Sequence, residues 1–322
     1  MVPVSPTRMT MSEYELRRNC SEDATEISDL IRESTNQWYI THGNPPIFTG
    51  DPNATRLFYD VYEELDPGCC MLAVEKKTGL IAGSCFYHPR STHVSLGIMN
   101  VHPDHFGKGL ARRLLNAVVS MSEDQKKPTR LVSSAMNLDS YSLYTRGGFV
   151  PRYAYQDMFL EVPQSGMPSQ KLPGLDRVRL ATLRDLEAIV QLEEEVQCIE
   201  RRKDHHFFLE NRQGIWNVCV IDHASGSGID GVLVSVKHPG STMLGPGVMR
   251  STADAAALIW YQLNQFHRGG RPVWLVPVEC DDLVAELYAW GARNCEIHFA
   301  QVRGMWKEPS GVVMPTFMPE TG

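Results

Sequence analysis

Apolar residues recur at helical spacing after a short glycine-rich turn near the middle of the first half of the chain. Leu110, Leu114 and Val118 fall four residues apart with polar residues between them, which predicts one apolar face of a helix. The preceding segment, residues 93–101, is rich in residues that favour strands, and Pro103 cannot extend a strand ladder. The chain is therefore predicted to pass from a strand through a tight turn into a helix.

The same periodicities, together with turn and capping residues, predict the other elements of the first half. They are a strand at 14–19, helices at 23–34 and 53–65, a hairpin built from 71–74 and 80–86, and a strand at 130–135 followed by a helix. Residues 38–51 contain glycine, prolines and several aromatics and are expected to form a loop. This loop either lines a binding pocket or packs on the core.

The order of elements begins again after residue 174. The predicted elements are a strand at 177–180, helices at 183–196, 204–211 and 253–266, and strands at 216–221, 229–236 and 273–278. In the segment that follows, residues 283–292, Leu287 and Tyr288 repeat the Leu143-Tyr144 pair of the first half. The second half is therefore predicted to be a diverged copy of the first.

The length of 322 residues predicts two domains rather than one. A stretch rich in proline, glycine and serine, without any periodicity, marks the boundary between them. The predicted organisation is a flexible N-terminus at 1–12, a first domain at 13–161, a linker at 162–174, a second domain at 175–305 and a C-terminal tail at 306–322.

The glycine-rich turn has the chemistry of an anion site. Gly107 and Gly109 let a ligand approach the backbone, and the helix that follows presents unpaired N–H groups at the positive end of its dipole. Lys108 is the cation expected beside bound phosphates. The turn matches neither a Walker loop, which needs Ser or Thr after the lysine, nor a dinucleotide fingerprint, which needs a third glycine and an acidic residue. The alternative is a turn that only starts a helix.

A second cluster, residues 137–149, follows the predicted strand at 130–135. The turn and this cluster together resemble the acetyl-CoA motif and the Asn-x-x-Ala-x-x-Leu-Tyr-x-x-x-Gly-Phe segment of the GNAT acyltransferase superfamily. The matching residues are Asn137, Leu143, Tyr144, Gly148 and Phe149, with Ser140 in the Ala place. The resemblance implies an α/β fold of two tandem GNAT-like domains, each a mostly antiparallel mixed sheet flanked by helices.

The resemblance also implies that the cofactor is acetyl-CoA (CoA). Its pyrophosphate would lie on the backbone amides of residues 106–111, its pantetheine arm would run beside the strand that ends at Val101, and Asn137 would hold that arm. A strand amide near Asn100 would polarise the thioester carbonyl, and Tyr144 would protonate the departing thiolate, unless it is a buried aromatic at a helix end. The implied cofactor-binding residues are Asn100, Val101, Phe106, Gly107, Lys108, Gly109, Leu110, Ala111, Asn137, Ser140 and Leu143.

The chain departs from the family pattern at two places. Phe106 stands where the family usually has Arg or Gln, and the strand before the turn has no glutamate that could act as a base. His93 and His102 are the candidate catalytic bases, because an imidazole has a pKa of about 6.5, and Asp139 is a further candidate. The alternative for each histidine is a residue with no catalytic part.

The composition limits the kinds of molecule that the protein is expected to bind. The net charge of −7 argues against binding to nucleic acid, and no apolar stretch is long enough for a membrane span or a secretion signal, so a cytoplasmic location is predicted. The eight cysteines lack Cys-x-x-Cys spacing, and the His102/His105 and His205/His206 pairs lack further ligands. No metal site is expected.

These features predict an N-acyltransferase that moves an acetyl group from acetyl-CoA to a primary amine of a small molecule or peptide by direct transfer. The alternative is a non-catalytic acyl-CoA-binding sensor or scaffold. The second copy lacks a cation between its glycines at 245–247, so its expected part is to cover one side of the cleft or to stabilise the chain. A monomer and a homodimer are both compatible with the sequence.

Overall fold

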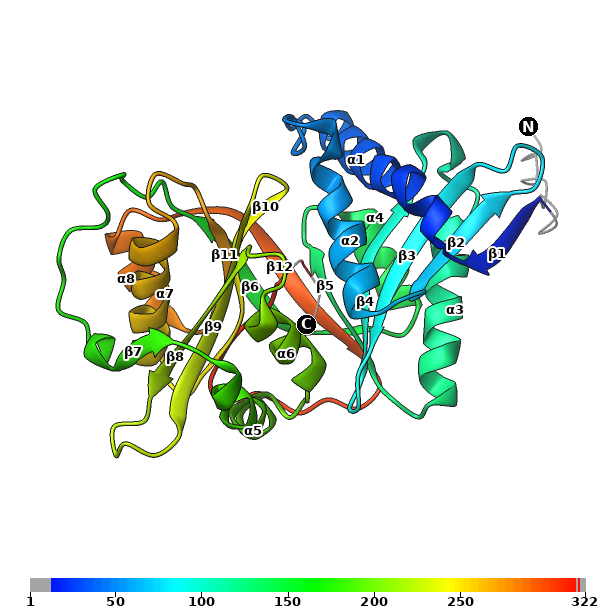
Figure 1. Cartoon of the computed structure of the whole chain (residues 1–322). Coiled ribbons are helices and arrows are strands. Elements are labelled where there is room, and N and C mark those ends of the chain that lie inside the picture. Colours follow the sequence, from blue (N-terminus) through cyan, green and yellow to red (C-terminus); the bar gives the residue numbers. More distant parts are fainter. Residues whose placement is uncertain (1–12, 317, 319–322) are drawn as a thin grey trace, which may run out of the picture.

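Two α/β halves lie side by side in the computed structural model, which describes residues 13–316 and 318 (Figure 1). The first half contains β1 (Tyr14–Arg18), α1 (Ala24–Thr41), α2 (Arg56–Leu65), β2 (Cys70–Glu75), β3 (Ile81–Pro89), β4 (Val94–Val101), α3 (Leu110–Asp124), β5 (Thr129–Ser134), α4 (Leu138–Arg146) and β6 (Val150–Phe159). The predicted N-terminal segment 1–12 lies outside the described residues.

The second half repeats this order of elements. It contains β7 (Val178–Leu180), α5 (Leu186–Gln197), α6 (Arg202–Glu210), β8 (Trp216–Asp222), β9 (Ile229–His238), β10 (Ser241–Met249), α7 (Thr252–Phe266), β11 (Val273–Pro277), α8 (Asp281–Ala289), β12 (Arg293–Arg303) and β13 (Val312–Met314). The repeated order and the mixed sheet flanked by helices confirm the predicted fold class.

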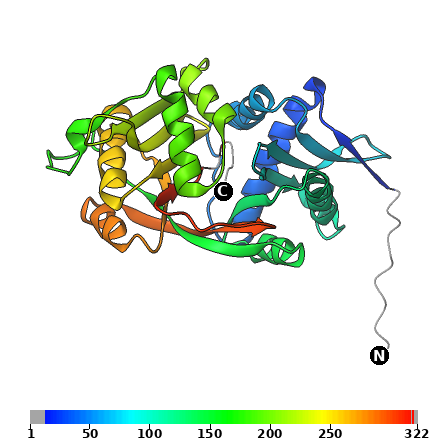
Figure 2. The same cartoon turned by 90° about the horizontal axis from the view of Figure 1, so that it is seen from below.

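The strands of both halves form one continuous sheet in the order β1-β2-β3-β4-β5-β12-β6-β11-β10-β9-β8-β7, with β13 paired to β10. The two halves exchange strands at its centre: β12 lies between β5 and β6, and β6 pairs in turn with β11. Figure 2 shows β6 in green and β12 in orange-red crossing together from one half to the other. The domain boundaries remain a prediction. The structure adds that the strands β6 and β12 are exchanged between the two halves.

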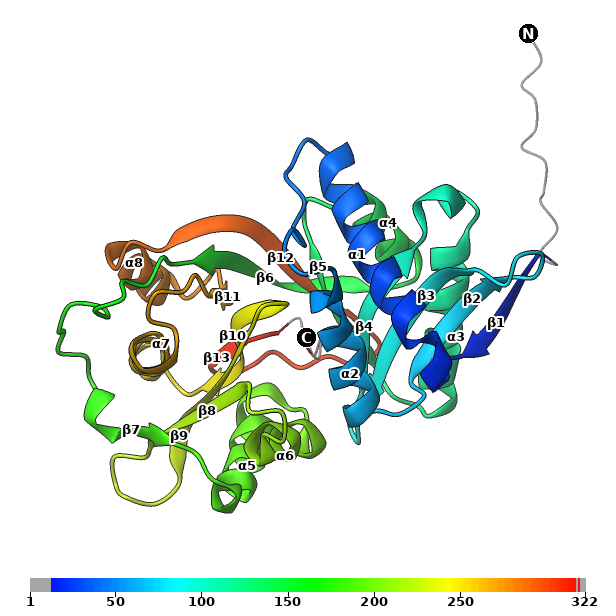
Figure 3. The same ribbon diagram turned by 45° about the horizontal axis from the view of Figure 1, so that its top comes forward.

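Helices cover both faces of the sheet, and α1 and α2 cross β3 and β4 (Figure 3). Side chains of α1 and α2 share one apolar core with those of α5 and α6, so this core spans both halves. The helices α3 and α4 pack over a separate core on the first half, and α7 and α8 over another on the second. Within the described residues, no helix has both the length and the apolar character needed to cross a membrane.

Several elements differ from the sequence-based expectations. The strands β10 and β13 have no predicted counterpart, and β13 lies in the predicted C-terminal tail. The helix α1 continues to Thr41, so the first part of the expected loop at 38–51 is helical. The strand β12 has no predicted counterpart, because it begins with the polar run Arg293-Asn294-Cys295-Glu296, which shows no clear alternation of apolar and polar residues. That run is stabilised as a strand by pairing with β6.

Candidate active site

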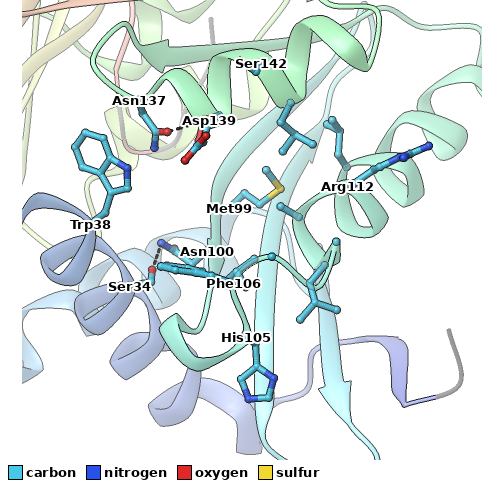
Figure 4. A pocket seen from close by; sticks show the side chains of 18 of the residues that line it. Ser34, Trp38, Met99, Asn100, His105, Phe106, Arg112, Asn137, Asp139 and Ser142 are labelled. Atoms are coloured by element: carbon cyan, nitrogen blue, oxygen red, sulfur yellow. Dashed lines mark hydrogen bonds between the residues drawn. The ribbon is translucent and has the colours of Figure 1, made fainter. Parts of the chain in front are cut away.

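A cavity of about 950 Å³ opens in the first half where β4 and β5 diverge. These two parallel strands pair only at their beginning, through Val94 with Thr129 and Ser95 with Arg130. Beyond that point the edge of β4 at residues 99–101 faces the cavity. Trp38 on α1 and Asn137 at the start of α4 lie across the opening from Asn100 and Phe106 (Figure 4).

The glycine turn forms one end of this cavity. Gly107 and Gly109 have φ angles of 75° and 76°, a left-handed conformation that residues with a Cβ atom rarely adopt. The first hydrogen bond of the following helix runs from the Arg113 amide to the Gly109 carbonyl oxygen, 3.2 Å apart, so the preceding amides have no acceptor within the helix. The end of the 15-residue α3 can therefore bind an anion through these amides.

The cations at this end differ from the expectation. Lys108 does not line the cavity: its Nζ lies 3.4 Å from His105 Nδ1 and 6.0 Å from the centroid of the Tyr14 ring. Arg112 and Arg146 line the cavity instead. Arg112 stands in the first turn of α3 directly after the glycine turn, and that position was the available signal in the sequence.

Most of the predicted cofactor-binding residues are brought together by the fold. Those that line the cavity are Asn100, Val101, Phe106, Gly107, Gly109, Leu110, Ala111, Asn137, Ser140 and Leu143. Asn137 also caps α4, because its Oδ1 accepts a hydrogen bond from the Ser140 amide at 2.9 Å. Asn100 donates to the Ser34 hydroxyl of α1, which connects β4 to the helix above it.

The three predicted catalytic residues do not line the cavity. Tyr144 is 7% exposed and its ring packs near Phe149 in the core beneath α3 and α4. His102 accepts a hydrogen bond from the Asp104 amide at Nδ1, and its Nε2 lies 3.8 Å from Glu33 on the neighbouring α1. Neither residue faces the cavity in this conformation.

His93 lies at the opposite end of β4, roughly 23 Å from Asn100 along the strand. Its side chain is fully buried, with Nδ1 2.9 Å from the Thr92 hydroxyl. Burial first, and then the positive charges of Arg130, Arg201 and Arg90, hold the pKa of His93 well below its ordinary value. Its placement corrects the expectation that it acts as the base in this site.

A group of acidic and aromatic residues next to the cavity had no counterpart in the sequence analysis. Asp157 on β6 and Glu296 on β12 are cross-strand partners, and His298 lies two residues along β12 on the same face. Tyr39 on α1 lines the cavity and donates from its hydroxyl to Glu296 Oε2 at 3.4 Å. We call Asp157, Glu296, His298 and Tyr39 the acidic cluster. No spacing along the chain reveals it, because its members come from three separate segments.

Burial controls the protonation of the acidic cluster. It raises the pKa of Asp157 to about 7, and burial together with the charge of Asp157 raises the pKa of Glu296 to about 7. Burial also lowers the pKa of His298 to about 4, so this ring is neutral at pH 7. In the described part of the chain, no Lys or Arg contributes to the pKa of either carboxylate.

These shifts predict a pH-dependent effect on stability. The native state holds more protons on these carboxyls than the unfolded state between about pH 4 and pH 7, so the free energy of unfolding falls as the pH rises through that window. We expect Asp157→Asn to leave the free energy of unfolding near the wild-type value at pH 4.5 and to raise it by about 2 kcal/mol at pH 8. Urea titrations at the two pH values measure this, with exposed Asp176→Asn as the control; a destabilised Asp157→Asn at pH 8 would contradict it.

The equivalent opening in the second half is filled by the chain itself. Here β10 and β11 pair in parallel only at Met243 and Leu244, and β13 pairs with β10 beyond that point. The segment lies so close that a Cβ atom at Gly245 would be 2.4 Å from the carbonyl oxygen of Pro315. The residues 312–316 thus occupy the space that is a cavity in the first half.

In a comparison with known protein families, residues 30–149 match the family model described as the Acetyltransferase (GNAT) family. A curated relative, UPF0157 protein YqkA of Bacillus subtilis (strain 168), is 35% identical over 74 residues, which are 23% of this chain and 21% of the relative. This match therefore spans about a fifth of the relative's length.

Three solved structures share the fold across most of the chain. A provisionally assigned acetyltransferase from Pyrococcus horikoshii is 14% identical with a TM-score of 0.69, over 99% of this chain and 97% of that one. A GCN5-related N-acetyltransferase from Sphaerobacter thermophilus is 16% identical with a TM-score of 0.61, over 93% and 99%. A tandem GNAT protein from the clavulanic acid biosynthesis pathway is 14% identical with a TM-score of 0.60, over 90% and 98%.

Proposed function

Since this chain is a two-domain member of the GNAT superfamily, we propose that it is an acyl-CoA-dependent N-acyltransferase. In the proposed reaction an acetyl group passes from acetyl-CoA to a primary amine of a small molecule or peptide. The observation that carries the proposal is the open glycine turn at the start of α3, which ends a cavity also lined by Arg112 and Arg146. If the turn served only to start a helix, no cavity beside its glycines would be needed.

The residues of the cavity fit a CoA thioester, which when bound supplies an activated acetyl group. The amides at the start of α3 would bind its diphosphate, and Arg112 and Arg146 would pair with phosphate charge. The edge of β4 at Asn100 and Val101 is not paired with β5, so its backbone groups are available to the amide groups of the pantetheine arm. Asn137 would hold the arm from the side of α4.

The protein would contribute to catalysis mainly by orienting the amine and the thioester relative to each other. Trp38 and Tyr39 on α1 lie across the cavity from the glycine turn and would place the amine against the thioester held on β4. A backbone amide near Asn100 would polarise the carbonyl group. Direct transfer is favoured over a covalent route through Cys85, because that side chain is buried in the core.

Calorimetric titration with acetyl-CoA, followed by measurement of CoA thiol release with a panel of primary amines, tests the proposal. We expect one binding site with a dissociation constant in the micromolar range and amine-dependent release of CoA, as is usual for an enzyme and its substrate. Absence of acetyl-CoA binding would overturn the proposal. Binding without turnover on any amine would identify a sensor or scaffold instead.

Tyr144→Phe tests the acid role that the family resemblance implies for Tyr144. If the Tyr144 hydroxyl protonates the thiolate, kcat should fall by about 100-fold while the dissociation constant of acetyl-CoA changes less than about twofold. Tyr141→Phe, on the same helix, is the matched control. Unchanged turnover in Tyr144→Phe would assign this residue to the core in which its ring is packed.

A further inference from the structure

The acidic cluster lies on the cavity side of the sheet. His298 on β12 is directly opposite Ser134 on β5, and Ser134 lines the cavity. Residues directly opposite each other in an antiparallel pair project from the same face, and Glu296 follows the same face two residues away. The two carboxylates are therefore on the side of the sheet where an acceptor would enter.

Tyr39 is the connection between the cavity and the carboxylates. Its ring lines the cavity and its hydroxyl donates to Glu296 Oε2 at 3.4 Å, a long and therefore weak hydrogen bond. Only this one side chain of α1 is seen both on the cavity wall and in contact with Glu296 among the described residues. Movement of the Tyr39 side chain would therefore open Glu296 to the cavity.

The carboxylates lack a compensating positive charge. Asp157 is 7% exposed, and neither its Oδ1 nor Glu296 Oε1 has a hydrogen-bond partner. His298 lies 3.7 Å from Asp157 Oδ2 and 3.9 Å from Glu296 Oε1, which is too far for strong hydrogen bonds, and its low pKa keeps it neutral. Two buried carboxylates without a cation are costly, and a bound cation would remove that cost.

We propose that Asp157 and Glu296 bind the second positive charge of a diamine acceptor while its other amine reacts at the edge of β4. This inference rests on the proposed N-acyltransferase function. An ammonium group offers three N–H donors, which suits the two oxygens that have no hydrogen-bond partner. In the sheet order β4-β5-β12-β6, the edge of β4 lies two strand spacings from β12 and three from β6, about 10–15 Å, so the acceptor would need a flexible chain between its two amines.

The acidic cluster could also accommodate a metal ion. Asp157, Glu296 and His298 each offer one possible ligand atom, and these atoms lie within 4.8 Å of one another. The contact of Glu296 with Tyr39, which lines the cavity, favours the ammonium group of an acceptor as the occupant. A metal ion is the competing occupant that the test must distinguish.

The test compares acceptors that differ only at the far end of the chain. With saturating acetyl-CoA, kcat/KM is measured for diamines of four to eight carbons, for the monoamines of equal length, and for the matching ω-amino acids. We expect the wild-type protein to prefer the best diamine over its monoamine by at least about 30-fold, with the amino acid poorest. The preference should grow from pH 6 to pH 8 as Asp157 and Glu296 ionise beside Tyr39, Cys295 and neutral His298.

Asp157→Asn and Glu296→Gln should each reduce the preference for the diamine at least tenfold, and Asp176→Asn, an exposed carboxylate in the second half, should keep it. Calorimetric titration of the diamine into the protein without acetyl-CoA should show binding that both variants weaken. Diamine binding tests the inference alone. The proposed N-acyltransferase function is tested separately, by the rate with monoamines and by acetyl-CoA binding. Equal use of diamine and monoamine, or tight binding of Zn²⁺ or Mn²⁺ that the variants abolish, would overturn the inference.

Discussion

Replacement of Gly107 and Gly109 together by alanine should weaken acetyl-CoA binding at least 100-fold, about 2.7 kcal/mol. Both residues have left-handed φ angles, 75° and 76°, and a Cβ atom makes such a conformation unfavourable by roughly 1–2 kcal/mol per residue. The turn would relax toward other angles, and the amides at the start of α3 would no longer converge. No other atom lies within 4 Å of the position that a Cβ atom would take at either glycine. The new methyl groups would therefore occupy the space where a diphosphate would bind.

The hairpin turn of the second half offers a matched control. Gly226 and Gly228 also have positive φ angles, 81° and 85°, and open space around them, but they lie between β8 and β9, away from the cavity. Gly226→Ala with Gly228→Ala should impose similar backbone strain and leave the affinity for acetyl-CoA at the wild-type value. Calorimetry on both variants measures this. An unchanged affinity in the Gly107/Gly109 variant would show that the turn does not bind the cofactor.

Removal of the Arg90 side chain should lower the free energy of unfolding by about 3–5 kcal/mol, because it would leave the buried Asp204 without its charged partner and Asp66 with only Lys203 and His88. Arg90 follows β3 and connects the two halves. Its Nη1 donates to Asp66 Oδ1 at 3.0 Å and its Nη2 donates to Asp204 Oδ1 on α6 at 2.8 Å. Asp66 and Asp204 are 4% and 1% exposed. The expected variant, Arg90→Ala, is measured by urea unfolding at pH 7.

The pH dependence of this effect has the opposite sign to that of the acidic cluster. Despite burial, hydrogen bonds and charge from His88 and Arg90 hold the pKa of Asp66 well below its ordinary value. A lowered carboxyl pKa stabilises the native state above the unfolded pKa of about 4, and this contribution is lost as the pH falls below it. Arg56→Ala, which breaks an exposed pair with Asp60 at 2.8 Å, should change stability by less than about 0.5 kcal/mol. A loss below 1 kcal/mol in Arg90→Ala would contradict the assigned role.

The amino-acid sequence by itself determined the local elements and the glycine turn. Helical periodicity from Leu110 onward, strand-forming residues before it and the left-handed preference of Gly107 and Gly109 are properties of short segments, and the structure has them at those places. The motif at 137–149 likewise lies beside the turn, because β4 and β5 are neighbours in the sheet. Ten of the eleven predicted cofactor-binding residues line one cavity for this reason.

Only the tertiary structure decided the features that depend on pairing between distant segments. The strand exchange of β6 and β12 brings Asp157 and Glu296 together, although 138 residues separate them in the chain, and α1 adds Tyr39 to the same place. The direction of individual side chains was also decided there: Lys108 lies against Tyr14, while His93 is buried at the far end of β4. Local propensity has no information on contacts of this range, because burial and charge at such a position are set by strands and helices that come from elsewhere in the chain.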